Sequence, residues 1–212
     1  MSKKLAGDKP GAEKNEAAET HAADNKPMRA DAQRNLDALL DAAKDVFVTV
    51  GVDAPVREIA EKAGVGVATL YRHFPQRADL IAAVFRREMD LCANAAPVIA
   101  ARHAPFEALA QWMQRYVTFI GTKRGLAKAL HSGDPAYDNL RGHFERSLCP
   151  AIQQLVAAAA KAGEIRKDVD ADELLAAAAS LCMSEYNDGP GRAGRMVALL
   201  VDGLRHGAKT KA

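Results

Sequence analysis

A short segment from Ile59 to Phe74 carries side chains suited to holding a sugar-phosphate backbone. It reads IAEKAGVGVATLYRHF, which predicts a short helix, a turn of three or four residues with two glycines, and a second short helix. This is the spacing of a helix-turn-helix, whose second helix lies in the major groove of DNA. In that second helix, four side chains can donate hydrogen bonds to phosphate oxygens: Thr69, Tyr71, Arg72 and His73. The segment therefore predicts a protein that binds double-stranded DNA.

The composition indicates which fold must position these residues. The chain has 212 residues, long enough for one large domain or two small ones. Hydrophobic residues make up 49% of it, and many of them are alanine, the best helix former. Aromatic residues are only 5%, and alternating runs of Val, Ile and Thr are absent. We therefore expect an all-α protein. The net charge of +2 argues neither for nor against nucleic acid, because binding depends on where the charge lies.

Other features of the sequence favour a cytoplasmic protein. No apolar stretch approaches the roughly 18 residues that a membrane span needs, and the charged N-terminus lacks the apolar core of a secretory signal. The three cysteines, Cys92, Cys149 and Cys182, are far apart, odd in number and outside any CxxC spacing. They are typical of buried thiols in a cytosolic protein. We expect no metal site, no cofactor and no membrane partner.

The periodicity of apolar residues divides the chain into three parts. Residues 1–28 are polar and rich in Lys, Glu, Ala and Asp, so we expect a disordered tail. Residues 29–76 should form a three-helix head with helices over 29–50, 55–63 and 67–74. Residues 77–212 should form a larger helical domain. Its expected helices cover 77–96, 106–123, 137–162, 170–183 and 192–206, with breaks at Gly125 and at 132–135.

Three runs in the head resemble a known family signature. They are Arg57-Glu58-Ile59-Ala60, Ala63-Gly64-Val65 and Thr69-Leu70-Tyr71-Arg72-His73-Phe74, followed by Arg77 and Leu80. Over residues 29–85 the chain is similar to TetR-family transcriptional regulators. Residues 123–127 and 163–169 resemble one subgroup of TetR effector domains. The resemblance implies a DNA-binding head joined to a helical domain for dimerisation and effector binding.

The resemblance also implies roles for residues of the head. Val67 and Ala68 would lie against base edges, where apolar side chains can contact only a thymine methyl or fill space. Arg57 would reach a guanine. Thr69, Tyr71, His73 and Arg77 correspond to phosphate-contacting positions. The alternatives are that Tyr71 is a core aromatic residue and that His73 only caps its helix.

The head has equal numbers of acidic and basic residues. Its affinity for DNA therefore depends on where these charges lie. Asp37, Asp41 and Asp45 repeat every four residues and share one face of the first helix. We expect this acidic stripe to point away from DNA. A neutral head implies weak binding by one copy, so a homodimer would bind a pseudo-palindromic operator through two heads.

The helical domain offers a candidate effector pocket and a candidate dimer surface. Trp112, Met113, Tyr116 and Phe119 are aromatic and Met side chains suited to an apolar small-molecule effector, although a stripe at helical spacing can equally be core. The last two helices are the candidate dimer surface. Its small residues would be Ala176 to Ala179 and Gly203, and its apolar patch Met196, Leu199 and Leu200. The alternative is that this face packs only within the monomer.

The resemblance implies a homodimeric repressor that a small-molecule effector releases from its operator. Two other classes of function remain open. An enzyme would need a catalytic constellation, but we find no nucleophile–base pattern, and GPGRAG at 189–194 matches GxGxxG without the strand that a dinucleotide site requires. A helical adaptor that lost DNA binding would keep the same head fold.

Overall fold

The protein is built from helices arranged as a small head on a long bundle. The computed structural model describes residues 25–130, 132–183 and 191–206, and over these residues it contains helices and no strand. The all-α prediction is confirmed. The head consists of α2 (Asn25–Thr49), α3 (Val56–Ala63) and α4 (Val67–His73). The bundle consists of α5 (Arg77–Ala100), α6 (Pro105–Leu130), the 3-10 turn η1 (Pro135–Tyr137), α7 (Leu140–Ala162), α8 (Ala171–Met183) and α9 (Arg192–Gly203).

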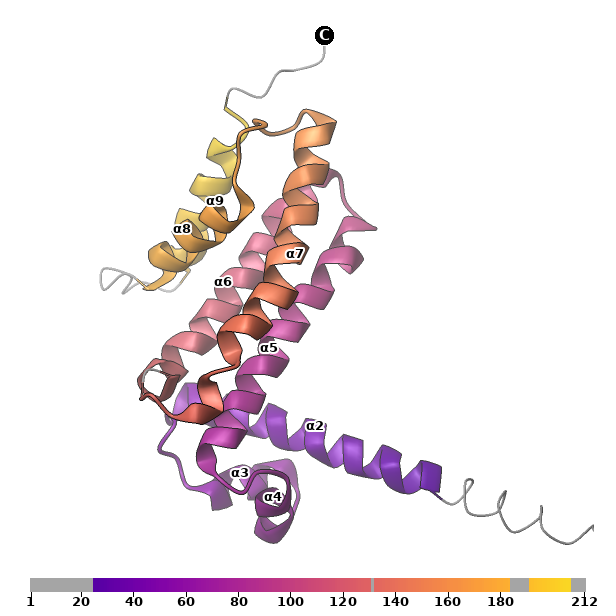
Figure 1. The fold of residues 1–212 in the computed structure, drawn as a ribbon, viewed down its shortest axis with the longest axis vertical. Helices are drawn as coiled ribbons and strands as arrows, with labels where there is room; N and C mark the ends of the chain where they lie inside the picture. The colour runs from indigo at the N-terminus through magenta and orange to yellow at the C-terminus, as the bar shows by residue number, and fades with distance from the viewer. Residues whose placement is uncertain (1–24, 131, 184–190, 207–212) are drawn as a thin grey trace, which may run out of the picture.

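Figure 1 shows how these parts meet. Helix α2 crosses the lower end of the bundle, with α3 and α4 beneath it, while α5, α6 and α7 run along the long axis. Helices α8 and α9 lie together at the side, and both pack against α6. Helix α6 also contacts α2, α5 and α7, so it is the element that most of the bundle packs against, although Gln114, Thr118 and Gly121 remain exposed.

The head has the small core that the sequence predicts. Leu39 and Phe47 of α2, Ile59 of α3, Leu70 of α4 and Phe74 are all buried. Ala63 packs against this core and is only partly buried. These side chains fix the angles between the three helices, and burying each large one contributes about 1.5–3 kcal/mol.

Helix α5 connects the head to the bundle without a break. A capping box starts it: the side chains of Gln76 and Asp79 each satisfy a backbone N–H of the first turn. Its 24 residues span about 36 Å at 1.5 Å per residue. The helix therefore reaches from the core of the head to the far end of the bundle.

Several helix ends differ from the sequence prediction. Helix α5 continues through Pro97, and α6 continues through Gly125, where breaks were expected. Pro97 is solvent-exposed, so water can replace the hydrogen bond that its missing N–H would have formed. A glycine costs a helix only about 1 kcal/mol, which the packing of α6 offsets. Helix α2 begins at Asn25, before the predicted boundary at residue 28.

The loop between α7 and α8 ties the bundle together. The Glu164 carboxylate accepts a hydrogen bond from the backbone N–H of Phe106, at 2.6 Å, in the first turn of α6. The backbone N–H of Arg166 donates to the Leu204 carbonyl beyond α9, at 2.9 Å. Ile165 between them is buried. This loop therefore connects the end of α7 to the start of α6 and the end of α9.

Candidate functional site

The turn between α3 and α4 sets the position of the second helix. Gly64 follows α3 in the left-handed conformation at φ 69°, and its N–H donates to the carbonyls of Ala60 and Glu61. The N–H of Val65 donates to the Ala60 carbonyl at 3.0 Å, which completes a Schellman motif. A residue with a side chain would be strained at this φ, so Gly64 is needed for the turn.

Helix α4 presents its polar face to solvent. Tyr71 is 51% exposed, Arg72 and His73 are also exposed, and Thr69 is partly exposed. Leu70 is 1% exposed and anchors the opposite face in the core. A core role for Tyr71 is therefore ruled out. The arrangement leaves the predicted hydrogen-bond donors of this helix free to meet a phosphate backbone.

Residues in the first turn of α4 and at the start of α3 are solvent-exposed. Val67 is 37% exposed and Ala68 is exposed. Arg57, whose side chain is 81% exposed, pairs with Glu61 one helical turn on, at 2.8 Å. An exposed pair of this kind is worth less than about 1 kcal/mol, so the guanidinium can leave Glu61 for a base at little cost.

Arg77 has a structural role that the sequence analysis missed. We predicted that it would contact a phosphate. Its Nη1 donates to the carbonyls of Val52 and Ala54, at 2.6 and 2.7 Å. These carbonyls lie in the loop between α2 and α3, so Arg77 fastens the start of α5 to the head. Arg77 is only partly buried, and its guanidinium has N–H groups besides those on Nη1, so its contact with a phosphate stays a prediction.

Ion pairs join α2 to its neighbours. Arg87 of α5 holds both carboxylate oxygens of Asp41, at 2.6 and 3.1 Å, and this hydrogen bonding raises the pKa of Arg87. The Lys44 ammonium lies 2.8 Å from the Glu88 carboxylate, which is nearly buried. Two members of the acidic stripe therefore pair with other elements: Asp41 with Arg87 of α5, and Asp45 with Lys62 of α3 at 3.0 Å. The direction of the stripe relative to bound DNA stays a prediction.

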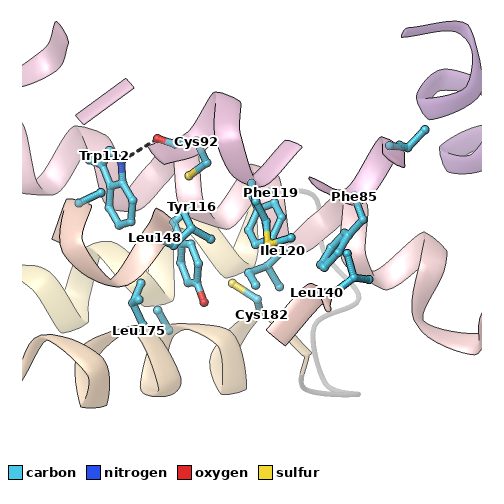
Figure 2. Packing of buried hydrophobic residues seen from close by; sticks show 14 of the residues in the cluster. Phe85, Cys92, Trp112, Tyr116, Phe119, Ile120, Leu140, Leu148, Leu175 and Cys182 are labelled. Carbon is cyan, nitrogen blue, oxygen red and sulfur yellow. Dashed lines mark hydrogen bonds between the residues drawn. The ribbon is translucent and has the colours of Figure 1, made fainter. Parts of the chain in front are cut away.

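The bundle contains an apolar cavity lined by residues of α5, α6, η1, α7 and α8. Its volume is about 480 Å³, within the usual range for small-molecule sites. Five aromatic rings contribute to its wall: Phe85 from α5, Tyr116 and Phe119 from α6, Tyr137 from η1, and Phe144 from α7. Its polar lining includes Arg141, Cys149 and Asp172. Figure 2 shows the side chains of Phe85, Phe119 and Tyr116 following one another along this region.

The four predicted effector-binding residues separate into two pairs. Tyr116 and Phe119 line the cavity, whereas Trp112 and Met113 do not. Trp112 is fully buried, donates its indole N–H to the Cys92 carbonyl at 2.9 Å, and stacks on Tyr116 (Figure 2). Met113 is fully buried as well. Because α6 is surrounded by other helices, its aromatic stripe continues past the cavity into the core.

Sequence reasoning missed most of the other lining residues. Tyr137, Leu140 and Phe144 come from a stretch that was expected to form one continuous helix, and they line the cavity from η1 and α7. Their spacing of three and four residues was the available signal. Asp172 lies in the helix predicted over 170–183, and no sequence pattern linked it to the cavity.

Comparison with known proteins identifies the fold and the family. Residues 39–84 match the model for bacterial regulatory proteins of the tetR family, and residues 104–206 match the C-terminal domain model of SbtR-like transcriptional regulators. The TetR transcriptional regulator SCO0520 from Streptomyces coelicolor is 38% identical, over 80% of this chain and 97% of that one, with a TM-score of 0.69. The chain belongs to the TetR family of transcriptional regulators. It is therefore a DNA-binding protein with a helix-turn-helix head.

Two further relatives are transcriptional regulators and agree with this membership. The TetR transcription regulatory protein from Mycobacterium vanbaalenii is 35% identical over 84% of this chain and 99% of that one, with a TM-score of 0.66. An HTH-type transcriptional regulator of Staphylococcus aureus (strain USA300) is 37% identical over 65 residues. That match spans 30% of this chain and about a third (35%) of the relative, so it supports the head alone.

The described part of this TetR-family chain shows neither a membrane span nor a metal-binding cluster. Among the residues that the structure describes, no helix has both the length and the hydropathy of a membrane span. The same residues contain no group of three or more His, Cys, Asp or Glu side chains that could hold a metal ion.

Proposed function

We propose that this TetR-family protein is a homodimeric repressor that a small molecule releases from its operator. It would act in the cytoplasm, on a pseudo-palindromic site, and without any catalytic step. The α3–α4 unit of each subunit would bind one half-site. The cavity among α5, α6, α7 and α8 would bind the effector.

The observation that carries this proposal is the double role of α5. Phe85 of this helix lines the cavity, and Arg87 and Glu88, in the following turn, hold α2 of the head through Asp41 and Lys44. A ligand that displaces Phe85 would therefore move the anchors of the head by way of one rigid element. Coupling of this kind is typically worth about 1–3 kcal/mol, a 5- to 150-fold change in DNA affinity.

Selection of bound fragments from a random DNA pool tests the proposal. A repressor of this architecture should enrich two inverted half-sites about one helical turn or a multiple apart. A gel-shift series on the selected site should then show sequence-selective binding that weakens with salt. If no sequence is enriched and no salt-sensitive shift appears, the protein is a helical adaptor that has lost DNA binding.

Replacing Arg57 by alanine should relax specificity at one base pair per half-site. The exposed guanidinium can form a bidentate contact with a guanine, which is worth about 1–3 kcal/mol of discrimination. Sequence logos from parallel selections with the wild type and the variant measure the effect. Arg57→Lys is the matched control: it keeps the charge but loses the bidentate geometry, so its logo should relax as well. An unchanged logo for Arg57→Ala would remove Arg57 from the interface.

Replacing Leu199 by aspartate should dissociate the homodimer. Leu199 on α9 is 73% exposed, Ala176 and Ala177 on α8 are exposed, and a Cβ at Gly203 would meet nothing within 4 Å. A buried, unpaired carboxylate at the centre of such a contact is strongly unfavourable. Sedimentation should show a monomer with unchanged helix content, whereas Val98→Asp, at an exposed position on α5, should stay dimeric. A dimeric Leu199→Asp variant would place the interface elsewhere.

A further inference from the structure

The charge distribution around the cavity indicates which kind of effector it accepts. Among the described residues that line it, Arg141 and Asp172 are the charged ones. The Arg141 side chain is 90% exposed, and its Nε lies 3.0 Å from the Glu145 carboxylate on the next turn of α7, so this guanidinium lies mostly in solvent and has an acidic partner there. No described cation forms an ion pair with Asp172. Asp172 is therefore the lining charge without a counter-ion among the described side chains.

The groups next to Asp172 do not neutralise it. Its neighbour Cys149 lines the same cavity, and burial and a hydrogen bond to Asp172 raise the pKa of the Cys149 thiol to about 11. At neutral pH the thiol thus stays protonated, and it can donate to the carboxylate without cancelling its charge. The backbone at the start of α8 is capped separately, because Asp170 accepts from the N–H groups of Asp172 and Glu173 at 2.8 and 2.9 Å. The Asp172 carboxylate is not needed to cap that helix.

The rest of the wall suits an apolar body that carries a positive charge. Phe85, Phe119 and Phe144 offer ring faces or edges with no polar group. Phe85 and Phe119 stack at a centroid distance of 5.3 Å and form one continuous surface. The electron-rich faces of such rings attract cations, and a large apolar ligand would bury apolar surface against them. A carboxylate in the wall of an aromatic cavity, here that of the solvent-exposed Asp172, then defines the orientation of the ligand.

We propose that the effector of this protein is a lipophilic cation, with an aromatic or aliphatic body among the rings of Phe85, Phe119 and Phe144 and its charged nitrogen beside Asp172. The inference rests on the proposed function, because it assigns a ligand class to the proposed effector cavity. It makes Asp172 the residue that distinguishes cations from anions. It makes the aromatic wall the source of most of the affinity.

Two ions of the same shape test the inference on the full-length dimer. Tetraphenylphosphonium and tetraphenylborate have similar size and opposite charge. The single tryptophan, Trp112, stacks on the cavity residue Tyr116 at 5.8 Å, so its fluorescence reports binding, and titration calorimetry gives the affinity. We expect the cation to bind at least about tenfold more tightly than the anion. Equal affinity, tighter binding of the anion, or binding of neither ion overturns the inference.

Asp172→Asn identifies the group responsible. The variant should weaken the cation about three- to tenfold and bring the two ions closer together in affinity, because one charge pair is lost. Glu173→Gln is the matched control, since it removes a carboxylate from the same first turn of α8 but does not line the cavity. Its cation affinity should not change. An Asp172→Asn variant that still prefers the cation to the same degree overturns the assignment.

Gel shifts separate this inference from the proposed function. Binding of the cation without release of the operator supports the ligand class and rejects the release step. Release of the operator by an anion, with loss of that effect in Arg141→Gln, keeps the release step and overturns the ligand class.

Discussion

Tyr71→Ala should abolish operator binding while leaving the fold and the dimer intact. The ring and hydroxyl are half-exposed on the outer face of α4, and the helix is anchored by the buried Leu70 beneath them. Truncation therefore removes a contact to DNA without opening the core. Each of the two heads on one operator loses this contact, at about 1.5–2 kcal/mol of binding free energy per head. Operator affinity should therefore fall at least about 100-fold.

A gel-shift or fluorescence-anisotropy titration on the selected operator measures this effect. Val98→Ala is the matched control, because Val98 is also 51% exposed but lies on α5 far along the bundle. Its operator affinity should equal that of the wild type, and sedimentation should show dimers for both variants. Equal affinity of Tyr71→Ala and wild type would show that α4 does not face the duplex in the way we infer.

Lys44→Met should destabilise the protein by about 1–3 kcal/mol. The change leaves the Glu88 carboxylate, which is 8% exposed, without the cation that lies 2.8 Å from it. A buried charge without a counter-ion destabilises the folded state. Because the Lys44 side chain is partly exposed, water reaches this ion pair, and the loss of stability should be smaller than for a fully buried pair. For a chain of this length, the melting temperature should fall by about 2–10 °C.

The double variant Lys44→Met/Glu88→Leu tests whether the loss of stability comes from the unpaired Glu88 charge. With both charges gone, most of the lost stability should return, because an apolar pair can replace a buried ion pair at little cost. Thermal unfolding of the two single variants and the double variant completes the cycle. Lys167→Met, which removes an exposed lysine in the loop before α8, should change stability by less than about 0.5 kcal/mol.

The same double variant also tests the role of α5 in operator release. It should still bind operator and effector, but the effector should lower operator affinity less than in the wild type, since one of the two α5–α2 anchors is missing. If release by the effector is undiminished, the Arg87–Asp41 pair alone suffices, or the signal does not pass through α5.

The residues from Ile59 to Phe74 show what local sequence determines. Apolar spacing, Gly64 at a left-handed position and the buried Leu70 define the helix-turn-helix by interactions that span only a few residues. Interactions between residues close in the sequence leave a pattern that the sequence itself shows. The sequence therefore predicted α3 and α4, their exposed hydrogen-bond donors and the all-α class. Even the dimer candidate Leu199 was visible as an apolar residue at an outward position of α9.

Tertiary structure decided everything that depends on which elements meet. Arg77 donates to the Val52 and Ala54 carbonyls, a role that no sequence pattern predicted, because the α2–α3 loop lies within its reach. Trp112 went into the core and Phe85 into the cavity wall because neighbouring helices cover different parts of α5 and α6. The pairing of Lys44 with Glu88 joins residues 44 positions apart, and the approach of Asp172 to the aromatic wall joins α8 to α5, α6 and α7. The periodicity of apolar residues predicts which side of a helix is buried, but not which element covers that side. The covering element decides whether a side chain belongs to the core, to an ion pair between helices or to the cavity wall.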